Sequence, residues 1–548
     1  MPDQCLTTTV TRSITVASGS FAPGHLGELT RHAPFDLVDA VIEETNTGAR
    51  RCRHLPSRVG MYFLLALALF PDLGYERVWG KLCAGLAGLP LHRPSEKALR
   101  DLRRRLGAAP LRALFEVVAG PLTRPSVPGV CYRRWRTVAF DGCSSIRAAD
   151  QPRVLGRLRK PRGRWGEAGY PTVQLMALVE TGTRGLLGAV FGSTETGERG
   201  YATRLLPLLS REMLVLMDRG FDSAEFFTDI AATGAQILAR LRSERRPAVL
   251  AVLPDGSYLT RLGTLKVRII EASVTVTTTD GKILEQTYLL GTTLLDHRSD
   301  PAEVLVRLYH ERWEIETAFY ALRHTLLNGR VLRSQDWFGL EQEIWSLLTM
   351  YQLVRRAMAE AVESVPGLDP DRASFTVAME TARTQVILAA GILPDDDSPG
   401  VIGGAVLGAL LPSRRSRTSA RKVKAPMSRY PGKNPDPRPL TSTNVTALTV
   451  AIIEPAPAAL PAPPRVGHRE LVLRLLRSEP DRDWHSQEIA ERTGQSNIRS
   501  LWTELNMWTR DGMLLKIKRN TYELAAQWRQ SPPSPAGTAT TLTDGVVP

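Results

Sequence analysis

The sequence predicts an α/β protein with a central sheet, on three observations. Met213–Met217 is a continuous apolar run with the length of a buried strand. A helical pattern and a further apolar run at 237–241 follow it, which is the order of a βαβ unit. Residues 301–327 predict a long helix, because Asp300 and Pro301 supply an N-cap and a first-turn proline.

Length and charge narrow the class of protein. The 548 residues are enough for about two to four domains. A net charge of +14 and a pI near 9.8 indicate a polyanionic partner, and nucleic acid is the first choice. Basicity alone also suits a ribosomal protein or a protein bound to a membrane surface.

Cysteine usage and hydropathy indicate a soluble protein of a reducing cytoplasm. The chain has five scattered cysteines and no CxxC pair, which argues against a disulfide framework or a zinc site. The apolar run Met61–Leu69 is too short to cross a bilayer, and the N-terminus lacks a signal pattern. We therefore expect no membrane partner.

Composition shifts divide the chain into segments. The β-rich stretch at 247–296 alternates strongly and interrupts the α/β pattern, with Asp-Gly turns at 255 and 280. The expected order is a flexible N-terminus (1–20), a helical domain (21–120), the α/β domain (130–395), a basic and proline-rich linker (396–466), a small domain of helices and a hairpin (467–526) and a disordered tail (527–548).

The helix at 301–327 carries two adjoining arcs of side chains. One arc is apolar and predicts a buried face: Val304, Leu308, Ile315, Phe319, Leu322 and Leu326. The other is polar: Tyr309, Arg312, Glu316 and Arg323. Glu316 is therefore expected at the edge of a packed interface, which is a suitable position for a metal-binding or catalytic acid. The alternative is an Arg–Glu pair on a solvated face.

The order of these polar residues carries a resemblance. Tyr309, Arg312, Glu316 and a base at 323, within YHERWEIETAFYALRHTLL, resemble the YREK signature of the DDE transposases of bacterial insertion sequences, the IS-four family. Arg323 departs from the usual lysine. It keeps the charge but replaces a compact ammonium with a planar guanidinium.

Two more segments resemble motifs of that family. The strand-like run Thr137–Phe140 is followed by Asp141 and Gly142, as in the first DDE motif. The sequence DRGFDS, which begins at Asp218, resembles the second. Taken alone, an Asp-Gly pair after a strand is usually just a turn, and many aspartates at a strand end like Asp218 only cap the next helix.

The resemblance implies a function and a site. It implies an RNase H-like core that contains the β-rich insertion, and two Mg²⁺ or Mn²⁺ ions held by Asp141, Asp218 and Glu316. It also implies cleavage at terminal inverted repeats of double-stranded DNA, joining of 3′ ends to target DNA, a homodimer, and action at the bacterial nucleoid. Residues that we expect to position DNA are Tyr309, Arg312 and Arg323, with Arg219 bracing the second motif.

The flanking domains suggest further DNA contacts. The N-terminal domain also resembles that of the family, and its arginines are either phosphate contacts or a solvated face: Arg50, Arg51, Arg53 and Arg103–Arg105. The small C-terminal domain resembles a winged helix, which binds DNA or protein. Its expected DNA contacts are Ser496, Asn497 and Arg499 on the third helix and Lys516, Lys518 and Arg519 on the wing.

A second class of function stays open. The chain could be a non-catalytic DNA-binding protein, or an inactive transposase relic that acts through its winged helix. The sequence holds no GxxxxGK[ST] or HExxH motif, so ATP-driven and zinc chemistry have no support.

Overall fold

We describe the protein from a computed structural model. It describes residues 13–15, 19–48, 54–163, 166–167, 169–310, 312, 316–392, 399–412, 417–419, 442–455, 468–495 and 498–529. The chain forms two compact units, Met1–Pro455 and Ala456–Pro548. Within the described residues, no helix combines the length and apolar content that crossing a membrane requires.

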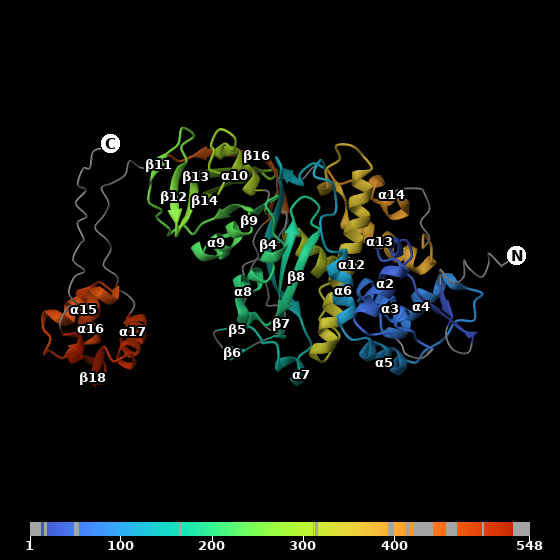
Figure 1. The fold of residues 1–548 in the computed structure, drawn as a ribbon, viewed down its shortest axis with the longest axis horizontal. Coiled ribbons are helices and arrows are strands. Elements are labelled where there is room, and N and C mark those ends of the chain that lie inside the picture. Colours follow the sequence, from blue (N-terminus) through green and yellow to red (C-terminus); the bar gives the residue numbers. More distant parts are fainter. Residues whose placement is uncertain are drawn as a thin grey trace, which may run out of the picture. The chain divides into compact units, whose positions relative to one another are not determined.

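A mixed sheet forms the centre of the first unit, which confirms the predicted α/β class (Figure 1). Its first part has the order β8-β7-β4-β9-β10. Strands β4, β7 and β8 are antiparallel neighbours, whereas β9 runs parallel to both β4 and β10. The bounds are β4 (Trp135–Arg147), β7 (Thr172–Glu180), β8 (Leu186–Gly192), β9 (Met213–Met217) and β10 (Gln236–Arg240).

Helices cover both faces of this sheet because neighbouring residues of a strand point to opposite faces. Val138 and Phe140 of β4 belong to a core with the residues of α8 (Gly197–Thr203) and α9 (Ala224–Ala232). Ala139, between them, belongs to the core shared with α12 (Trp337–Glu363). Figure 1 shows α8 and α9 on one side of the sheet and α12 on the other.

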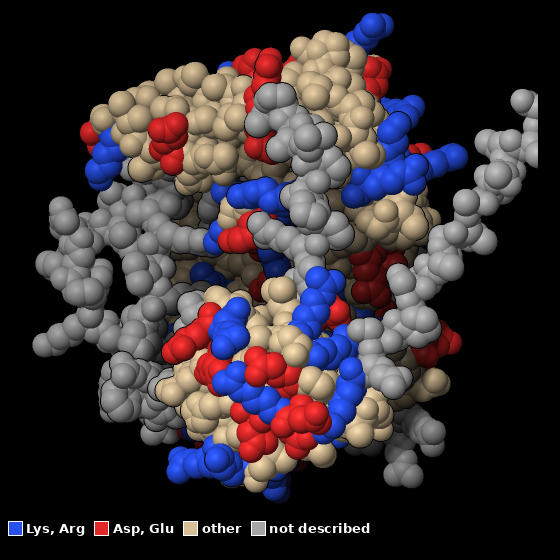
Figure 2. Space-filling view, turned by 90° about the vertical axis from the view of Figure 1, so that its left-hand side faces the viewer, with Lys and Arg blue, Asp and Glu red and all other residues tan. Residues whose placement is uncertain are grey.

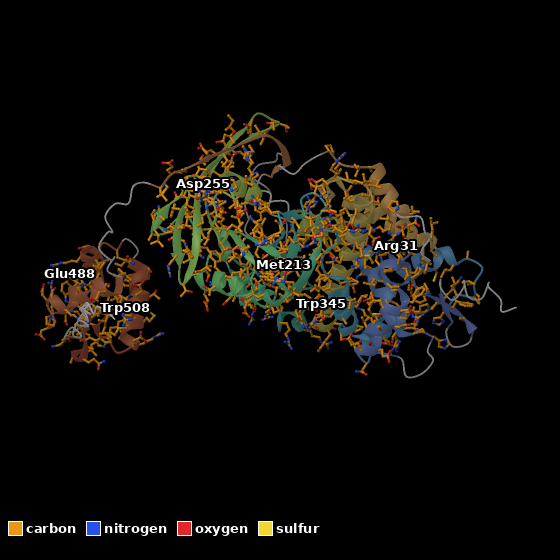
Figure 3. The ribbon with its side chains drawn as sticks, turned by 45° about the horizontal axis from the view of Figure 1, so that its top comes forward. Arg31, Met213, Asp255, Trp345, Glu488 and Trp508 are labelled. Carbon is orange, nitrogen blue, oxygen red and sulfur yellow. The ribbon has the colours of Figure 1, made fainter. Side chains whose placement is uncertain are left out.

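Helix α12 joins the sheet to the N-terminal helices. Trp345 of α12, labelled in Figure 3, packs against Phe191 of β8 with ring centroids 4.8 Å apart. Helix α3 is apolar all round and almost wholly buried, as expected for a helix surrounded by others. The bounds are α2 (Phe35–Glu44), α3 (Ser57–Leu69), α4 (Tyr75–Cys83), α5 (Glu96–Leu106), α6 (Ala109–Val118) and α13 (Phe375–Leu388).

The expected β-rich insertion extends the central sheet. Strand β14 pairs antiparallel with β10, and the order continues through β13 and β12 to β11. The bounds are β11 (Ala251–Val252), β12 (Tyr258–Leu262), β13 (Leu265–Thr278) and β14 (Ile283–Thr292). The insertion therefore hydrogen-bonds to β10, which is the neighbour of β9, the strand that precedes Asp218.

The segment 396–466 is not only a linker. It contains helix α14 (Gly400–Gly408), which packs on α12 and α13, and strand β16 (Ser442–Ile452). Strand β16 pairs antiparallel with β13, for example Val450 with Val274. The basic run 414–424 lies outside the described residues except for the backbone of 417–419. Composition alone missed this strand because its partner lies far away in the chain.

The predicted single helix at 301–327 is divided. The structure has helix α10 (Ala302–His310), helix α11 (Glu316–Tyr320) and the π-helix η8 (Ala321–Leu326). The expected apolar face is wrong at Val304, which is 43% exposed, because α10 turns Leu305, Val306 and Tyr309 inward instead. Phe319, Leu322 and Leu326 are buried as predicted.

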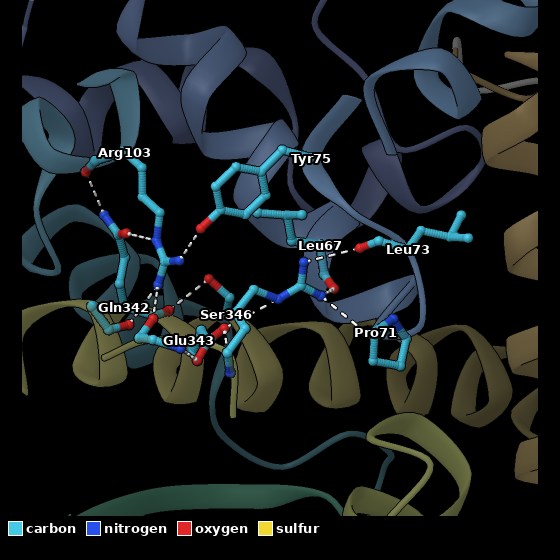
Figure 4. Close-up of polar contacts among 11 residues, drawn as sticks. Leu67, Pro71, Leu73, Tyr75, Arg103, Gln342, Glu343 and Ser346 are labelled. Atoms are coloured by element: carbon cyan, nitrogen blue, oxygen red, sulfur yellow. Dashed lines mark hydrogen bonds and ion pairs between the residues drawn. The ribbon is translucent and has the colours of Figure 1, made fainter. Parts of the chain in front are cut away.

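Arg103 is not an exposed phosphate contact. Its guanidinium donates from Nε to Oε1 of Gln342 at 2.6 Å and from Nη1 to the Tyr75 hydroxyl at 2.6 Å (Figure 4). It also donates to the carbonyl of Gly339 at 2.7 Å. These partners hold α5 to the first turns of α12. Arg105 donates to the carbonyl of Leu55, whereas Arg104 is exposed.

The second unit is a small helical domain with a three-stranded sheet. Helices α15 (His468–Ser478), α16 (Ser486–Thr493) and α17 (Ile498–Arg510) precede a hairpin of β18 (Leu514–Lys518) and β19 (Thr521–Leu524), and β17 (Trp484–His485) pairs with β19. Trp484 and Trp508 lie in its core. The hairpin turns at Asn520, whose φ is +60°, a conformation that asparagine tolerates.

Candidate active site

Asp141 and Asp218 lie at matching positions on two neighbouring parallel strands. In the register of β4 with β9, Ala139 pairs with Leu216. Asp141 lies two residues after Ala139, and Asp218 lies two residues after Leu216. The prediction that Asp141 ends its strand is wrong, since β4 continues to Arg147 against β7. Only the parallel pairing with β9 stops before Asp141. Adjacent strands lie about 4.8 Å apart, so the two carboxylates share one edge of the sheet.

Each aspartate is fixed by a backbone N–H close by. Oδ1 of Asp141 accepts a hydrogen bond from Gly142 N–H at 3.0 Å. Oδ1 of Asp218 caps the short helix η6 (Arg219–Phe221) and accepts from Gly220 N–H at 2.8 Å. Both side chains are half-buried. Their orientation therefore follows from the local backbone.

Arg312 brings the third motif to this edge. Its side chain is 7% exposed. Burial opposes the charge of the guanidinium, but Tyr309, Asp218 and Asp141 raise the pKa of Arg312 above its ordinary value. Burial likewise raises the pKa of Tyr309, and Asp218 adds to that rise. Both aspartates therefore lie within electrostatic reach of Arg312.

Tyr309 is part of the core beside Arg312. It is almost fully buried, its ring packs edge-on against Tyr288 at 5.7 Å, and the Arg312 guanidinium lies 5.9 Å from its centre. Residues 309 and 312 therefore form one packed pair at the end of α10. The first residue of α11 is Glu316, and its side chain lies outside the described residues.

Arg323 lies on the π-helix η8, and its side chain contacts strand β4. Its Nη1 donates a hydrogen bond to Oγ of Ser145, which lies four residues beyond Asp141. Its Nε is buried and has no hydrogen-bond partner among the described residues. π-Helical turns occur often at functional sites. This guanidinium is thus held near the acidic edge by one of its nitrogens.

Two family models match parts of the chain. Residues 23–116 match the family described as insertion element 4 transposase N-terminal, and residues 141–353 match the transposase DDE domain. The second match begins at Asp141 and spans Asp218, Glu316 and the arginines just described.

The chain belongs to the IS4 (IS-four) family of DDE transposases.

Two individual proteins are similar to this transposase. The transposase InsG of insertion sequence element IS4 from Escherichia coli (strain K12) is 26% identical over 411 residues, which cover 72% of this chain and 91% of InsG. A piggyBac transposase in a synaptic complex with hairpin DNA has a TM-score of 0.34 and 11% identity. That likeness covers 68% of this chain and 85% of the piggyBac chain.

The donor set suits divalent cations. Asp141 and Asp218 offer carboxylate oxygens, which are the ligands that Mg²⁺ and Mn²⁺ prefer. The negative charges of both aspartates favour the charged form of Arg312, and they favour a bound cation for the same reason. No cluster of three His, Cys, Asp or Glu that could hold a metal exists among the described residues, which omit the Glu316 side chain. The two aspartates thus fit a cation site that needs a further ligand.

Arg219 is exposed and lines a basic cavity next to the second motif. The cavity has a volume of about 430 Å³, and its lining includes Arg219, Arg240, Arg245 and Arg246. Arg240 stacks on the ring of Tyr288 at 4.5 Å, and its charge also acts on Tyr309. Sequence reasoning missed Arg240, although an arginine inside the apolar run at 237–241 was a signal.

The C-terminal candidates are only partly described. The side chain of Arg499 and all of Ser496 and Asn497 lie outside the described residues. Lys518 and Arg519 are exposed at the tip of the β18–β19 hairpin. Figure 2 shows acidic and basic side chains interspersed over this unit. Arg482, for example, pairs with both Glu479 and Glu488.

Proposed function

We propose that this transposase cuts DNA at the terminal inverted repeats of its element and joins the freed 3′ ends to target DNA. The observation that carries the proposal is the parallel register of β4 and β9, which sets Asp141 beside Asp218. The charges of both aspartates also act on Arg312 of the third motif. Three carboxylates of motifs far apart in the chain are what a two-cation phosphodiester site needs.

The strand order supports an RNase H-like core. Three antiparallel strands (β8, β7 and β4) are followed by two parallel ones (β9 and β10), and the helix with the third acid comes after the insertion. In the proposal, Asp141, Asp218 and Glu316 hold two Mg²⁺ or Mn²⁺ ions. When bound, the ions neutralise the phosphate and stabilise the leaving oxygen.

The basic residues have a separate role in the proposal. Tyr309 and Arg312 hold the acidic edge together, and the half-buried guanidinium of Arg323 contacts a phosphate oxygen. Arg219 contacts the DNA backbone from the basic cavity. The C-terminal unit binds double-stranded DNA as a winged helix, with Arg499 on α17 and with Lys518 and Arg519 on the wing. We also propose a homodimer that brings two DNA ends together at the bacterial nucleoid.

Magnesium-dependent nicking of a duplex that carries the element's end tests the function. We expect cleavage by the full chain and its loss in Asp141→Ala, Asp218→Ala and Glu316→Ala. Asp229→Ala, an exposed acid on α9, is the matched control and should cleave normally. DNA binding without cleavage by the unaltered chain would instead support the relic.

A further inference from the structure

A fourth acidic side chain approaches the aspartates from the other face of the sheet. Glu198 lies on α8, whose residues pack against β7 and η6. A β-carbon placed on Gly142 would lie 2.8 Å from Oε1 of Glu198. A β-carbon placed on Gly220 would lie 3.8 Å from Oε2 of Glu198 and 2.9 Å from Oδ1 of Asp218. The Glu198 carboxylate therefore lies beside the glycine of each aspartate motif.

Gly142 and Gly220 are required by the limited space around them and not by their backbone conformation. Neither Gly142 nor Gly220 is among the glycines with positive φ, so the backbone at both positions suits any residue. At Gly142, however, a side chain would collide with the carboxylate carbon of Glu198, which lies 3.1 Å from the added atom. The sequence of the first motif thus leaves room for Glu198 immediately after Asp141.

A buried amide points to the same place. Nε2 of Gln174 lies 3.2 Å from the β-carbon position at Gly142. Gln174 is 5% exposed, and this nitrogen has no hydrogen-bond partner in the described part of the chain. A buried N–H group without a partner is costly, which indicates that a ligand with an acceptor atom belongs here. The Gln174 amide can donate a hydrogen bond to a water, and the Glu198 carboxylate can accept one from it, so the two groups together suit a bound water.

We propose that Glu198 is a fourth acidic residue of the cation site and that it acts through a water of the cation's hydration shell. Mg²⁺ dehydrates reluctantly and keeps several waters in protein sites. Glu198 accepts a hydrogen bond from such a water, and Gln174 donates one to it. Asp141, Asp218 and Glu198 form no cluster that could hold a metal directly. We therefore place Glu198 in contact with a water of the cation and not with the cation itself. Glu198 is thus a positioning residue, and this inference rests on the proposed function.

Mn²⁺ affinity of the full chain without DNA tests the inference, measured by titration calorimetry or by the electron paramagnetic resonance signal of free Mn²⁺. Outer contacts of a metal typically contribute about 10- to 100-fold to affinity. We expect Glu198→Gln and Gln174→Leu each to weaken Mn²⁺ binding about tenfold, and Glu198→Asp to weaken it less. Glu195→Gln is the matched control, since Glu195 pairs with Arg159 at 3.0 Å on the exposed surface.

The outcomes separate this inference from the proposed function. If the unaltered chain and Asp141→Asn bind Mn²⁺ equally or not at all, the proposed cation site itself is wrong. If Asp141→Asn loses Mn²⁺ while Glu198→Gln keeps the affinity of the unaltered chain, the inference about Glu198 is overturned. Thermal unfolding of each variant accompanies the titration, because a merely structural role would lower the melting temperature and leave the affinity unchanged.

Discussion

Asp255 and Arg268 form an ion pair that attaches the β-rich insertion to the first turn of α10. Arg268 is fully buried, and it also donates to Oγ of Ser257 at 2.8 Å and to the carbonyl of Asp300 at 2.6 Å. Oδ2 of Asp255 accepts from the N–H of Ala302 at 3.0 Å. The pair therefore fixes the start of helix α10, which leads to Tyr309 and Arg312.

Removing this carboxylate should destabilise the first unit. Asp255→Ala leaves the Arg268 guanidinium buried without its counter-ion, which typically costs about 3–5 kcal/mol. We expect a loss of that size in the free energy of unfolding from chemical denaturation, together with reduced cleavage. Asp280→Ala, at the exposed hairpin turn of the same insertion, should leave the free energy of unfolding unchanged within the error of the measurement. Equal stabilities of the two variants would contradict the anchoring role.

Arg312 should be essential for cleavage. Without its charge, Asp141 and Asp218 repel each other across the strand pair, and Tyr309 loses its partner. We expect Arg312→Ala to cleave at least about 100-fold more slowly in single-turnover assays, the usual effect of removing one preorganised charge. Arg307→Ala is the control, because Arg307 forms an exposed pair with Glu303 on the same helix. Similar rates for the two variants would assign Arg312 to the scaffold alone.

The guanidinium of Arg323 should be partly replaceable. Lysine is usual at this position in the family that the sequence resembles, and one ammonium can satisfy a single phosphate oxygen. We expect Arg323→Lys to retain cleavage within about tenfold, and Arg323→Ala to lose about 100-fold. The apparent affinity for DNA, measured by fluorescence anisotropy, should fall in the alanine variant. Unchanged cleavage in Arg323→Ala would remove Arg323 from the site.

Local sequence predicted the strands and acids better than it predicted long-range pairing. The apolar run Met213–Met217 is the strand β9 to the residue, because a run buried on both faces needs no knowledge of its neighbours. The extension of β4 through Asp141 depends on β7, and strand β16 depends on β13. Hydrophobic period alone shows neither how far β4 continues along β7 nor which strand pairs with β16.

Buried arginines were the least predictable part of the fold. Arg103 lies in a basic helix that looks solvated, yet its partner Gln342 is 239 residues away in the chain. Arg268 stands within an alternating strand pattern that gave it no role. A charged residue is buried only where distant segments supply its partners, and a single sequence does not show which segments meet. Arg312, in contrast, was found because its motif is local.

Gly142 provides an independent check on the packing around Asp141. A methyl group at this position must displace the Glu198 carboxylate or the Gln174 amide. We expect Gly142→Ala to reduce cleavage about tenfold or more while it binds DNA normally, since about 1.4 kcal/mol of disturbed transition-state geometry gives that factor. Gly404→Ala is the control, because nothing lies within 4 Å of its added carbon. Full activity of Gly142→Ala would show that the space beside Asp141 is not restricted.

His32 should make the first unit less stable at mildly acidic pH. Burial, together with the charges of Arg31 and Arg356, lowers the pKa of His32 to about 3, although Glu360 lies 3.4 Å from its Nδ1. Below its ordinary pKa of about 6.5, the unfolded chain binds a proton that the folded chain does not, so stability falls as pH decreases from 6.5 toward 3. This histidine alone should lower the free energy of unfolding by about 1.4 kcal/mol between pH 8 and pH 5.5. Denaturation curves at both pH values should show this loss in the unaltered chain and in His297→Asn. In His32→Asn, the loss of unfolding free energy between the two pH values should be smaller by this contribution of His32. Equal losses in His32→Asn and His297→Asn would show that His32 is not held neutral in the folded chain.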